Sequence, residues 1–171
     1  KQRTVMQSIA DFQSPLMKQL FVCSTLVFQL LFVSAGAQNA IALEPQLNLP
    51  RTTIQAGMRR IDAQVAAQPK ELAIGLMFRK SMPAHEGMIF VFPEPARQCF
   101  WMRNTLIPLS VAFLSEDGHI INTAEMHALS DTPHCSSKPA KYVLEMNKGW
   151  FKKAGLKAGD LLSSPLFQAQ P

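Results

Sequence analysis

The stretch LSVAFLSEDGHIINTA, residues 109–124, decides the fold class of this chain. It holds two apolar-rich segments, 109–114 and 119–124, on either side of the sequence EDG at 116–118. Asp-Gly between two such segments is a strong signal for the tight turn of a β-hairpin. The stretch therefore predicts two antiparallel strands, and it sets the β character of the domain.

Other segments show strand patterns of their own. GMIFVF at 87–92 is continuously apolar, which predicts a strand buried on both faces and ended by the prolines that follow. The segment 58–67 alternates apolar residues with outward-facing Arg60, Asp62 and Gln64, which predicts a half-buried strand. Further strands are expected at 99–102 and 140–146, with Tyr142, Leu144 and Met146 on one face, and a stub at 161–162.

Two short helices complete the prediction. Pro69 and Glu71 suit the first turn of a helix over 69–79, in which Gly75 is explained by close packing on a neighbour. A second helix is expected over 147–154, stopped by Gly155. Short strands with frequent turns favour a mainly β fold, a compact antiparallel β sandwich or barrel-like single domain with one or two short helices.

Composition excludes several classes of protein. Of the 171 residues, 47% are apolar and 17% charged, which excludes a disordered chain. Three cysteines are too few for a disulfide-rich scaffold. The net charge of +5 is scattered along the chain, so it carries little information about partners.

The N-terminal region has the pattern of a secretory signal. A lysine after Met17 precedes an apolar run over 20–33, and small residues follow at 34–37. The run of 14 residues is shorter than the roughly 20 that span a membrane. We expect removal of residues 1–37, with Met17 as the true start, no stable membrane anchor afterwards, and a periplasmic or secreted protein.

The mature chain then divides into three parts. Residues 38–51 hold two prolines and no clear periodicity, which indicates a flexible arm. Residues 52–163 are expected to form the single domain, and 164–171 a tail.

The two cysteines outside the signal region, Cys99 and Cys135, are expected to form a disulfide. An even pair in an exported protein is usually bonded. The competing interpretation is a nucleophilic Cys135 activated by His134, but adjacent residues on an extended chain point to opposite sides.

Metal and cofactor binding find little support in the sequence. Met126, His127, His134 and Cys135 lie close together and would suit copper. Their spacing matches no metal loop, and no phosphate-binding or dinucleotide-binding glycine pattern occurs. We therefore expect no metal and no cofactor.

Hydrolytic and nucleic-acid-binding patterns are also weak. No serine lies in a G-x-S-x-G elbow, and no two carboxylates are placed together. Three lysines at 148, 152 and 153 beside Trp150 and Phe151 resemble a solvated helix face whose aromatic residues anchor the core. We expect no nucleic-acid partner.

The segment FWMRNTLIP, residues 100–108, is the strongest candidate site. Trp101, Arg103, Asn104 and Thr105 could form the mouth of a polar pocket that Arg79 or Glu145 completes. The guanidinium fork of arginine favours an anion. Alternatively the segment is a structural turn, with Asn104 at the bend and Arg103 paired with a buried acid such as Glu145.

Several segments together resemble one family. They are GLMFR at 75–79, GMIFVF at 87–92, FWMRNTLIPL at 100–109, DGHII at 117–121 and YVLEM at 142–146. In this order the chain resembles the domain of unknown function 192 family over about residues 52–163. CSSKPAKYVLEMNKGWF at 135–151 resembles its secreted bacterial members.

The resemblance implies a small, mostly β, sandwich-like single domain, and it supplies no catalytic residue. Members often carry Asp where this chain has Ser110, so a proposal that needs a carboxylate there fails. Arg103 stands where Lys is common, which keeps the positive charge.

Two functional hypotheses follow from these observations. The first is an exported β domain that binds a small polar or anionic ligand, or an envelope protein, at residues 101–105. The second is a periplasmic hydrolase acting on an envelope or carbohydrate substrate. The sequence leaves open whether any reaction is catalysed.

Overall fold

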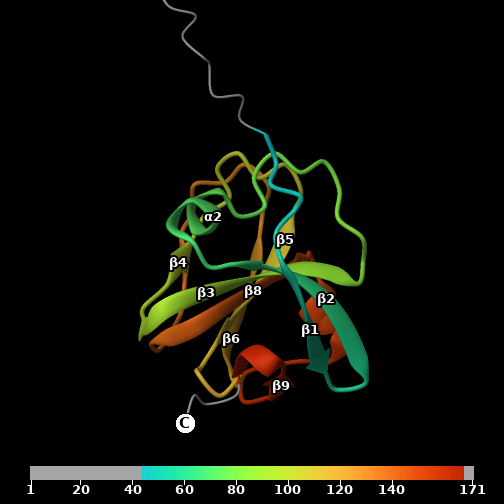
Figure 1. Cartoon of the computed structure of the whole chain (residues 1–171), viewed down its shortest axis with the longest axis vertical. Coiled ribbons are helices and arrows are strands. Elements are labelled where there is room, and N and C mark those ends of the chain that lie inside the picture. The colour runs from blue at the N-terminus through green and yellow to red at the C-terminus, as the bar shows by residue number, and fades with distance from the viewer. Residues whose placement is uncertain (1–43, 168–171) are drawn as a thin grey trace, which may run out of the picture. The chain divides into compact units, whose positions relative to one another are not determined.

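The predicted hairpin is present in the computed structural model, which describes residues 44–167 (Figure 1). Strand β5 (Leu109–Leu114) pairs antiparallel with β6 (Ile120–Met126). Gly118 lies in the turn with a φ of 89°. A Cβ at this position would come within 2.6 Å of the Leu162 carbonyl oxygen, so both the backbone angle and the space require glycine.

The hairpin belongs to a seven-stranded sheet with the order β6-β5-β8-β3-β2-β1-β9. The other strands are β1 (Arg51–Ala56), β2 (Arg59–Ala66), β3 (Glu86–Ala96), β8 (Ala140–Asn147) and β9 (Leu162–Ser163). All neighbours are antiparallel except β2 and β3, which run parallel. The parallel pair departs from the prediction, and its long connection contains helix α2 (Pro69–Ile74).

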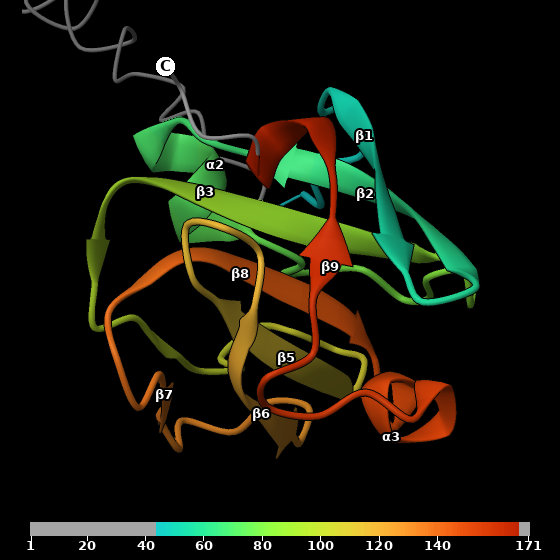
Figure 2. The same ribbon diagram turned by 90° about the horizontal axis from the view of Figure 1, so that it is seen from below.

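The sheet curls until its two edges meet. His119, beside β6, forms a β-bridge with Leu161, beside β9. Figure 2 shows β9 lying between β1 and β6 at this point. The described residues therefore form a mainly β, barrel-like single domain, as the sequence predicts.

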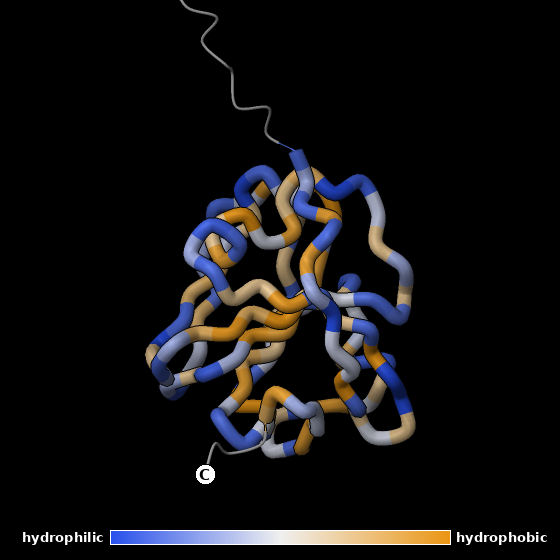
Figure 3. The backbone as a smooth tube through the Cα atoms, in the orientation of Figure 1, coloured by the Kyte–Doolittle hydropathy of each residue, from blue (hydrophilic) through white to orange (hydrophobic). Residues whose placement is uncertain are grey.

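Two hydrophobic cores pack on the two faces of the sheet. The inner core draws residues from strands across the whole sheet, including Tyr142, Leu144 and Met146 on the predicted face of β8. The outer core includes Val143 and lies against the central strands β3, β8 and β5. These central strands form the most hydrophobic part of the chain trace in Figure 3.

The outer face is covered by short elements. These are α2 and a separate two-stranded sheet of β4 (Cys99–Phe100) and β7 (His134–Cys135). The predicted disulfide joins Cys99 to Cys135, whose Cα atoms lie 4.0 Å apart. The disulfide closes a loop of 36 residues, which is worth about 4 kcal/mol in the chain-entropy account.

Both helices are shorter than predicted. Helix α2 ends at Ile74 because Gly75 takes a positive φ of 51°. A Cβ on Gly75 would lie 3.1 Å from the Phe90 ring, so the expected close packing is present. Helix α3 (Trp150–Ala154) starts late because β8 continues to Asn147 and Gly149 turns the chain in the left-handed region.

Strand β3 is longer than predicted and runs through Pro93 and Pro95 to Ala96. Its pairing with β8 breaks after Val91 and resumes only at Ala96. The prolines therefore lie where the ladder needs no N–H donor, which is why they do not end the strand.

Residues 44–50 form no helix or strand, yet they are hydrogen-bonded to the domain. Gln64, predicted to face outward, is buried because its amide donates to the Leu47 carbonyl at 2.5 Å and its oxygen accepts from Arg79. At the other end, a 3₁₀ turn (Pro165–Phe167) places Phe167 in the inner core.

The predicted signal region at 1–37 lies outside the described residues, as do 38–43 and 168–171. None of the helices between residues 44 and 167 combines the length and the hydrophobicity needed to cross a membrane.

Candidate functional site

A pocket of about 270 Å³ opens on the outer face between α2, β4 and the segment that follows β4. Most of its wall is apolar and comes from residues 72–77 of α2 and its C-terminal turn, and from rings on β3 and β4. The described residues that line it are Leu72, Ala73, Ile74, Gly75, Leu76, Met77, Phe90, Phe92, Gln98, Cys99, Phe100, Trp101, Thr105 and Glu145.

Glu145 is the one ionisable side chain among these described lining residues, since Cys99 is in the disulfide. It sits in the middle of β8, paired across the sheet with Met88 of β3 and Val111 of β5. Its side chain is only 4% exposed. Within residues 44–167, no hydrogen bond or ion pair reaches its carboxyl group, and burial raises the pKa of Glu145 to about 8.

Four aromatic rings line the same pocket. They belong to Phe90, Phe92, Phe100 and Trp101. The Phe90 and Phe100 rings are 4.8 Å apart and nearly perpendicular, and Phe92 stands edge-on to Phe100 at 6.4 Å. Aromatic rings at right angles to one another thus line the same pocket as Glu145.

Backbone hydrogen bonds fix the segment that carries Trp101 and Thr105. Met102 donates to the Ser130 carbonyl at 2.8 Å, and Leu129 donates to the Thr105 carbonyl at 3.0 Å. Asn104 takes a positive φ of 64°, and its carbonyl accepts from Phe78 at 2.9 Å. Asn104 therefore occupies the bend, as the structural interpretation of the segment predicts.

Arg103 lies outside the pocket and does not pair with Glu145. Its exposed guanidinium donates to Asp131 at 2.8 Å, and this hydrogen bond raises the pKa of Arg103. The guanidinium carbon lies 4.8 Å from the centre of the Trp101 ring. The predicted Arg103–Glu145 pair is therefore wrong, because Asp131 is the acid within reach.

Arg79 is buried away from the pocket, behind α2. Its Nη2 donates to the Gln64 side chain and to the Gln46 carbonyl, and burial lowers the pKa of Arg79. Gln46 in turn donates to the carbonyls of Glu71 and Gly75 at 2.9 and 3.0 Å. Arg79 thus helps to hold the helix that forms one wall.

Of the six predicted site residues, the structure brings three to one pocket: Trp101, Thr105 and Glu145. Arg103 and Asn104 support its rim, and Arg79 supports a wall. The three phenylalanines and the α2 wall were not predicted as site residues. The spacing of Leu72 and Leu76, one helical turn apart, is the one local pattern in the sequence that predicts an apolar helix face at this wall.

The disulfide braces the pocket from the side. Cys99 lines it, and the neighbouring Gln98 exchanges two hydrogen bonds with Ser136 at 2.8 and 3.0 Å. These contacts tie β4 to β7 and hold Phe100 and Trp101 in place.

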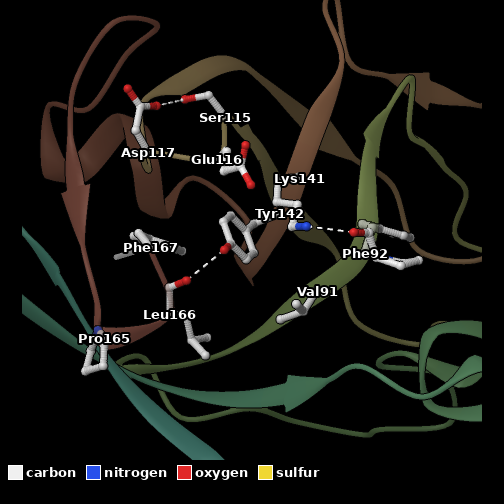
Figure 4. A pocket seen from close by; sticks show the side chains of 11 residues that line it. Val91, Phe92, Ser115, Glu116, Asp117, Lys141, Tyr142, Pro165, Leu166 and Phe167 are labelled. Atoms are coloured by element: carbon white, nitrogen blue, oxygen red, sulfur yellow. Dashed lines mark hydrogen bonds between the residues drawn. The ribbon is translucent and has the colours of Figure 1, made fainter. Parts of the chain in front are cut away.

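A larger cavity of about 930 Å³ lies between β3, β8, the β5–β6 turn and the C-terminal 3₁₀ turn (Figure 4). Most of its polar groups already have partners, and Glu116 is exposed. Tyr142 donates to the Leu166 carbonyl at 2.7 Å, Lys141 donates to the Pro93 carbonyl at 2.7 Å, and Asp117 accepts from Ser115. This cavity therefore offers a ligand fewer unmet polar groups than the pocket at Glu145.

Ser110 is held in a structural cluster. Its hydroxyl donates to Glu125 at 2.8 Å and accepts from the Gly149 N–H at 2.7 Å. Glu125 on β6 thus supplies a carboxylate beside Ser110. The cluster anchors the turn before α3.

The structure also bears on the aromatic helix at 150–154 and on the candidate metal ligands. Phe151 packs in the inner core, as expected for an aromatic anchor of a solvated helix. Among residues 44–167, no three His, Cys, Asp or Glu side chains gather into a metal-binding group.

These features define a class of protein: a small, disulfide-braced, curled β-sheet domain with an acid-containing aromatic pocket on its outer face. Within that class, the chain belongs to the DUF192 family, described as an uncharacterized ACR, which matches residues 51–164. The family resemblance seen in the sequence is therefore confirmed.

Two solved structures are similar to this chain. One is a candidate transcription regulator from Sinorhizobium meliloti 1021, with 29% identity, a TM-score of 0.66, and coverage of 70% of this chain and 97% of that one. The other is a protein of unknown function from Novosphingobium aromaticivorans DSM 12444, with 32% identity, a TM-score of 0.63, and coverage of 75% and 99%. No curated protein is significantly similar to this chain.

Proposed function

We propose that this protein binds a small ligand in the pocket between α2 and Trp101, and that Glu145 is the polar group that fixes the ligand. The observation that carries the proposal is the Glu145 carboxyl, which is buried, lines a cavity, and has no hydrogen-bond partner among residues 44–167. Burial of this carboxyl raises its pKa, so its charged form is disfavoured in the empty pocket. A ligand that bonds to Glu145 offsets the cost of this burial.

The size and lining of the pocket support a small, mostly apolar ligand. Its volume of about 270 Å³ is near the lower end of the range for ligand sites. Aromatic and aliphatic walls with one or two polar groups are the usual composition of such sites. Besides Glu145, the buried Thr105 and the side chain of Gln98 can orient a ligand.

The sequence also suggested an anionic ligand because of its two arginines. In the structure Arg103 is paired outside the pocket and Arg79 is buried behind α2. No lysine, arginine or histidine is among the described residues that line the pocket. The proposed ligand therefore carries a polar group that meets Glu145, and it is not an anion.

The hydrolase hypothesis has less support. A carboxyl with a pKa near 8 suits a general acid, but glycoside hydrolysis uses a pair of carboxylates. Glu145 has no second acid and no Ser–His pair beside it among the described lining residues. Binding is the simpler role for this site.

We also propose that the domain works in the periplasm or outside the cell. The Cys99–Cys135 disulfide supports this, because disulfides persist mainly in oxidising compartments. N-terminal sequencing of the protein from a periplasmic fraction is expected to begin near Gln38 or Leu43. Recovery of an intact chain from the membrane would contradict export with signal removal.

The binding proposal is tested by thermal shift with a set of small amines, alcohols, sugars and carboxylates. The full chain is compared with Ala73→Trp, which places an indole at an exposed position of the pocket wall. Ala84→Trp, at an exposed position outside this wall, is the matched control.

At least one compound is expected to raise the melting temperature of the wild type and of Ala84→Trp while leaving Ala73→Trp unchanged. The proposal fails if no compound stabilises the wild type, or if the stabilisation persists in Ala73→Trp.

A further inference from the structure

Building on the proposed pocket, we infer that its ligand is a small organic cation, a substituted ammonium ion held between the Glu145 carboxylate and the surrounding aromatic rings. The inference rests on the proposed function and adds the charge and chemical class of the ligand. It follows from three observations: the charge balance of the pocket, the arrangement of its rings, and the state of Trp101.

The charge balance comes first. Glu145 meets no positive group on the elements packed against it: β3 and β5 present Met88 and Val111, and α2 and β4 present apolar side chains. Of the charged groups on these elements, Lys70 and Glu94 are exposed and do not line the pocket, and three others have partners of their own. Lys141 donates to the Pro93 carbonyl, Glu86 pairs with Arg51, and Glu71 caps the start of α2. A buried carboxylate that the protein leaves without a counter-ion is complementary to a cationic ligand.

The rings supply the second observation. Phe90, Phe92, Phe100 and Trp101 line the same small space, with Phe90 and Phe92 nearly perpendicular to Phe100. The face of an aromatic ring carries partial negative charge, so rings at right angles attract an ammonium group from more than one side. Aromatic walls with one acid are the arrangement by which proteins bind alkylated ammonium groups.

Trp101 provides the third observation, because its ring already holds a cation. The Arg103 guanidinium stacks 4.8 Å from the ring centre, and Asp131 fixes the guanidinium with a hydrogen bond of 2.8 Å. This stack orients the indole at the mouth of the pocket. Trp101 is 42% exposed, which leaves part of the ring free for a ligand.

The inference requires that binding be linked to protonation. Burial raises the pKa of Glu145 to about 8, so the empty pocket holds a protonated carboxyl at pH 6 to 7. A cation is attracted to the ionised form, so binding releases the proton to solvent. For a quaternary ammonium ion, which does not titrate, affinity rises about tenfold per pH unit below pH 8 and levels off above it.

The test uses choline and its neutral isostere 3,3-dimethyl-1-butanol as probes. Calorimetric titrations are made on the full chain at pH 6, 7, 8 and 9. The variants are Glu145→Gln, which removes the charge but keeps the shape, and Trp101→Leu, which changes an exposed ring. Glu116→Gln, an exposed acid at the other cavity, is the matched control.

At pH 8 and 9, choline is expected to bind the wild type and Glu116→Gln more tightly than the isostere does. Glu145→Gln should weaken choline about 30-fold and remove the pH dependence. Trp101→Leu should weaken choline about threefold to fivefold and leave the isostere nearly unchanged. Because Trp101 is partly exposed, this second variant gives a result even if Glu145→Gln folds poorly.

Three results at pH 8 and 9 would overturn the inference: equal or tighter binding of the isostere, unchanged choline affinity in Glu145→Gln, or no choline binding. The proposed function is judged separately. If alcohols, sugars or carboxylates stabilise the wild type and lose their effect in Ala73→Trp, the binding pocket stands and only the cation is wrong.

Discussion

Arg79 and Glu145 are two buried charged side chains that the fold treats in opposite ways. Arg79 bonds to the Gln64 side chain and the Gln46 carbonyl, and it lies between the N-terminal segment and α2. Glu145 has no such partners within residues 44–167, and it faces a cavity. The protein supplies acceptors for the Nη2 of Arg79, although its Nε has no partner among the described residues, whereas Glu145 is left open to solvent or a ligand.

Whether the chain supplies partners for a buried charged group distinguishes a structural residue from a candidate functional residue more clearly than burial alone does. A buried charge that the chain satisfies contributes to stability, and its removal leaves its former partners unsatisfied. A buried acid that the chain leaves unsatisfied costs stability, which is a common feature of functional sites. The contrast between Arg79 and Glu145 has measurable consequences for stability.

The pH dependence of stability should show the largest effect. The Glu145 carboxyl keeps its proton up to about pH 8 when folded but releases it near its ordinary value of 4.5 when unfolded. Between these values the folded state binds more protons, so stability falls as pH rises. The stabilisation is fully present below about pH 4.5 and is lost as pH rises to about 8.

We expect Glu145 to lower the free energy of unfolding by about 3 kcal/mol between pH 5 and pH 8. This decrease is measured by urea denaturation of the wild type and of Glu145→Gln over that range, and it is the difference between the two curves. Parallel curves for the two proteins would show that Glu145 titrates normally and would remove the contrast with Arg79.

Replacing Arg79 should have the next largest effect on the free energy of unfolding. Arg79→Met is expected to lower the free energy of unfolding by about 2 kcal/mol, because Gln64 and the Gln46 carbonyl lose a buried donor. The Nε of Arg79 has no partner among the described residues, so its loss offsets part of this cost.

The matched control for this change is Arg60→Met, at an exposed position. Chemical denaturation of the control is expected to give a change within about 0.5 kcal/mol. If both variants lose the same small amount, Arg79 is not the structural support that its contacts indicate.

Replacing Glu145 should raise the free energy of unfolding, in contrast to replacing Arg79. Glu145→Met places a thioether between Met88 and Val111, in surroundings that are otherwise apolar. We expect a gain of about 1 kcal/mol at pH 7 to 8, because a carboxyl without a partner is removed. Thermal and urea denaturation measure this gain, and a clear loss of stability would mean that the carboxyl has a stabilising partner.

The sequence predicts the sheet better than it predicts the site. The hairpin at 109–124 and the alternating faces of β8 follow from local patterns, and the structure confirms them. The early end of α2 depends on how Gly75 meets Phe90, which is a distant contact. Gln64 faces outward by pattern but is covered by Arg79 and Leu47, which lie far from it in sequence.

The candidate site likewise combines features that follow from local sequence with features that depend on distant contacts. The unusual polar residues after β4 and Glu145 are predicted from the sequence, and Trp101, Thr105 and Glu145 line one pocket. The choice of Asp131 over Glu145 for Arg103 depends on how two loops meet. Nothing local distinguishes Phe90, Phe92 and Phe100 from core residues, because only the folded chain shows which buried rings face a cavity.

The smallest expected effect compares two buried hydroxyls. Thr105 lines the pocket at 5% exposure, and its hydroxyl makes no hydrogen bond within residues 44–167. Ser110 has two partners, Glu125 and the Gly149 N–H. Thr105→Val should therefore change the free energy of unfolding by less than about 0.5 kcal/mol, whereas Ser110→Ala should cost about 1–2 kcal/mol. The backbone hydrogen bonds of Thr105 are kept in valine, so urea denaturation isolates the hydroxyl. If Thr105→Val costs as much as Ser110→Ala, the pocket hydroxyl is satisfied by the protein, and Glu145 and the Gln98 side chain would then be the groups left for a ligand.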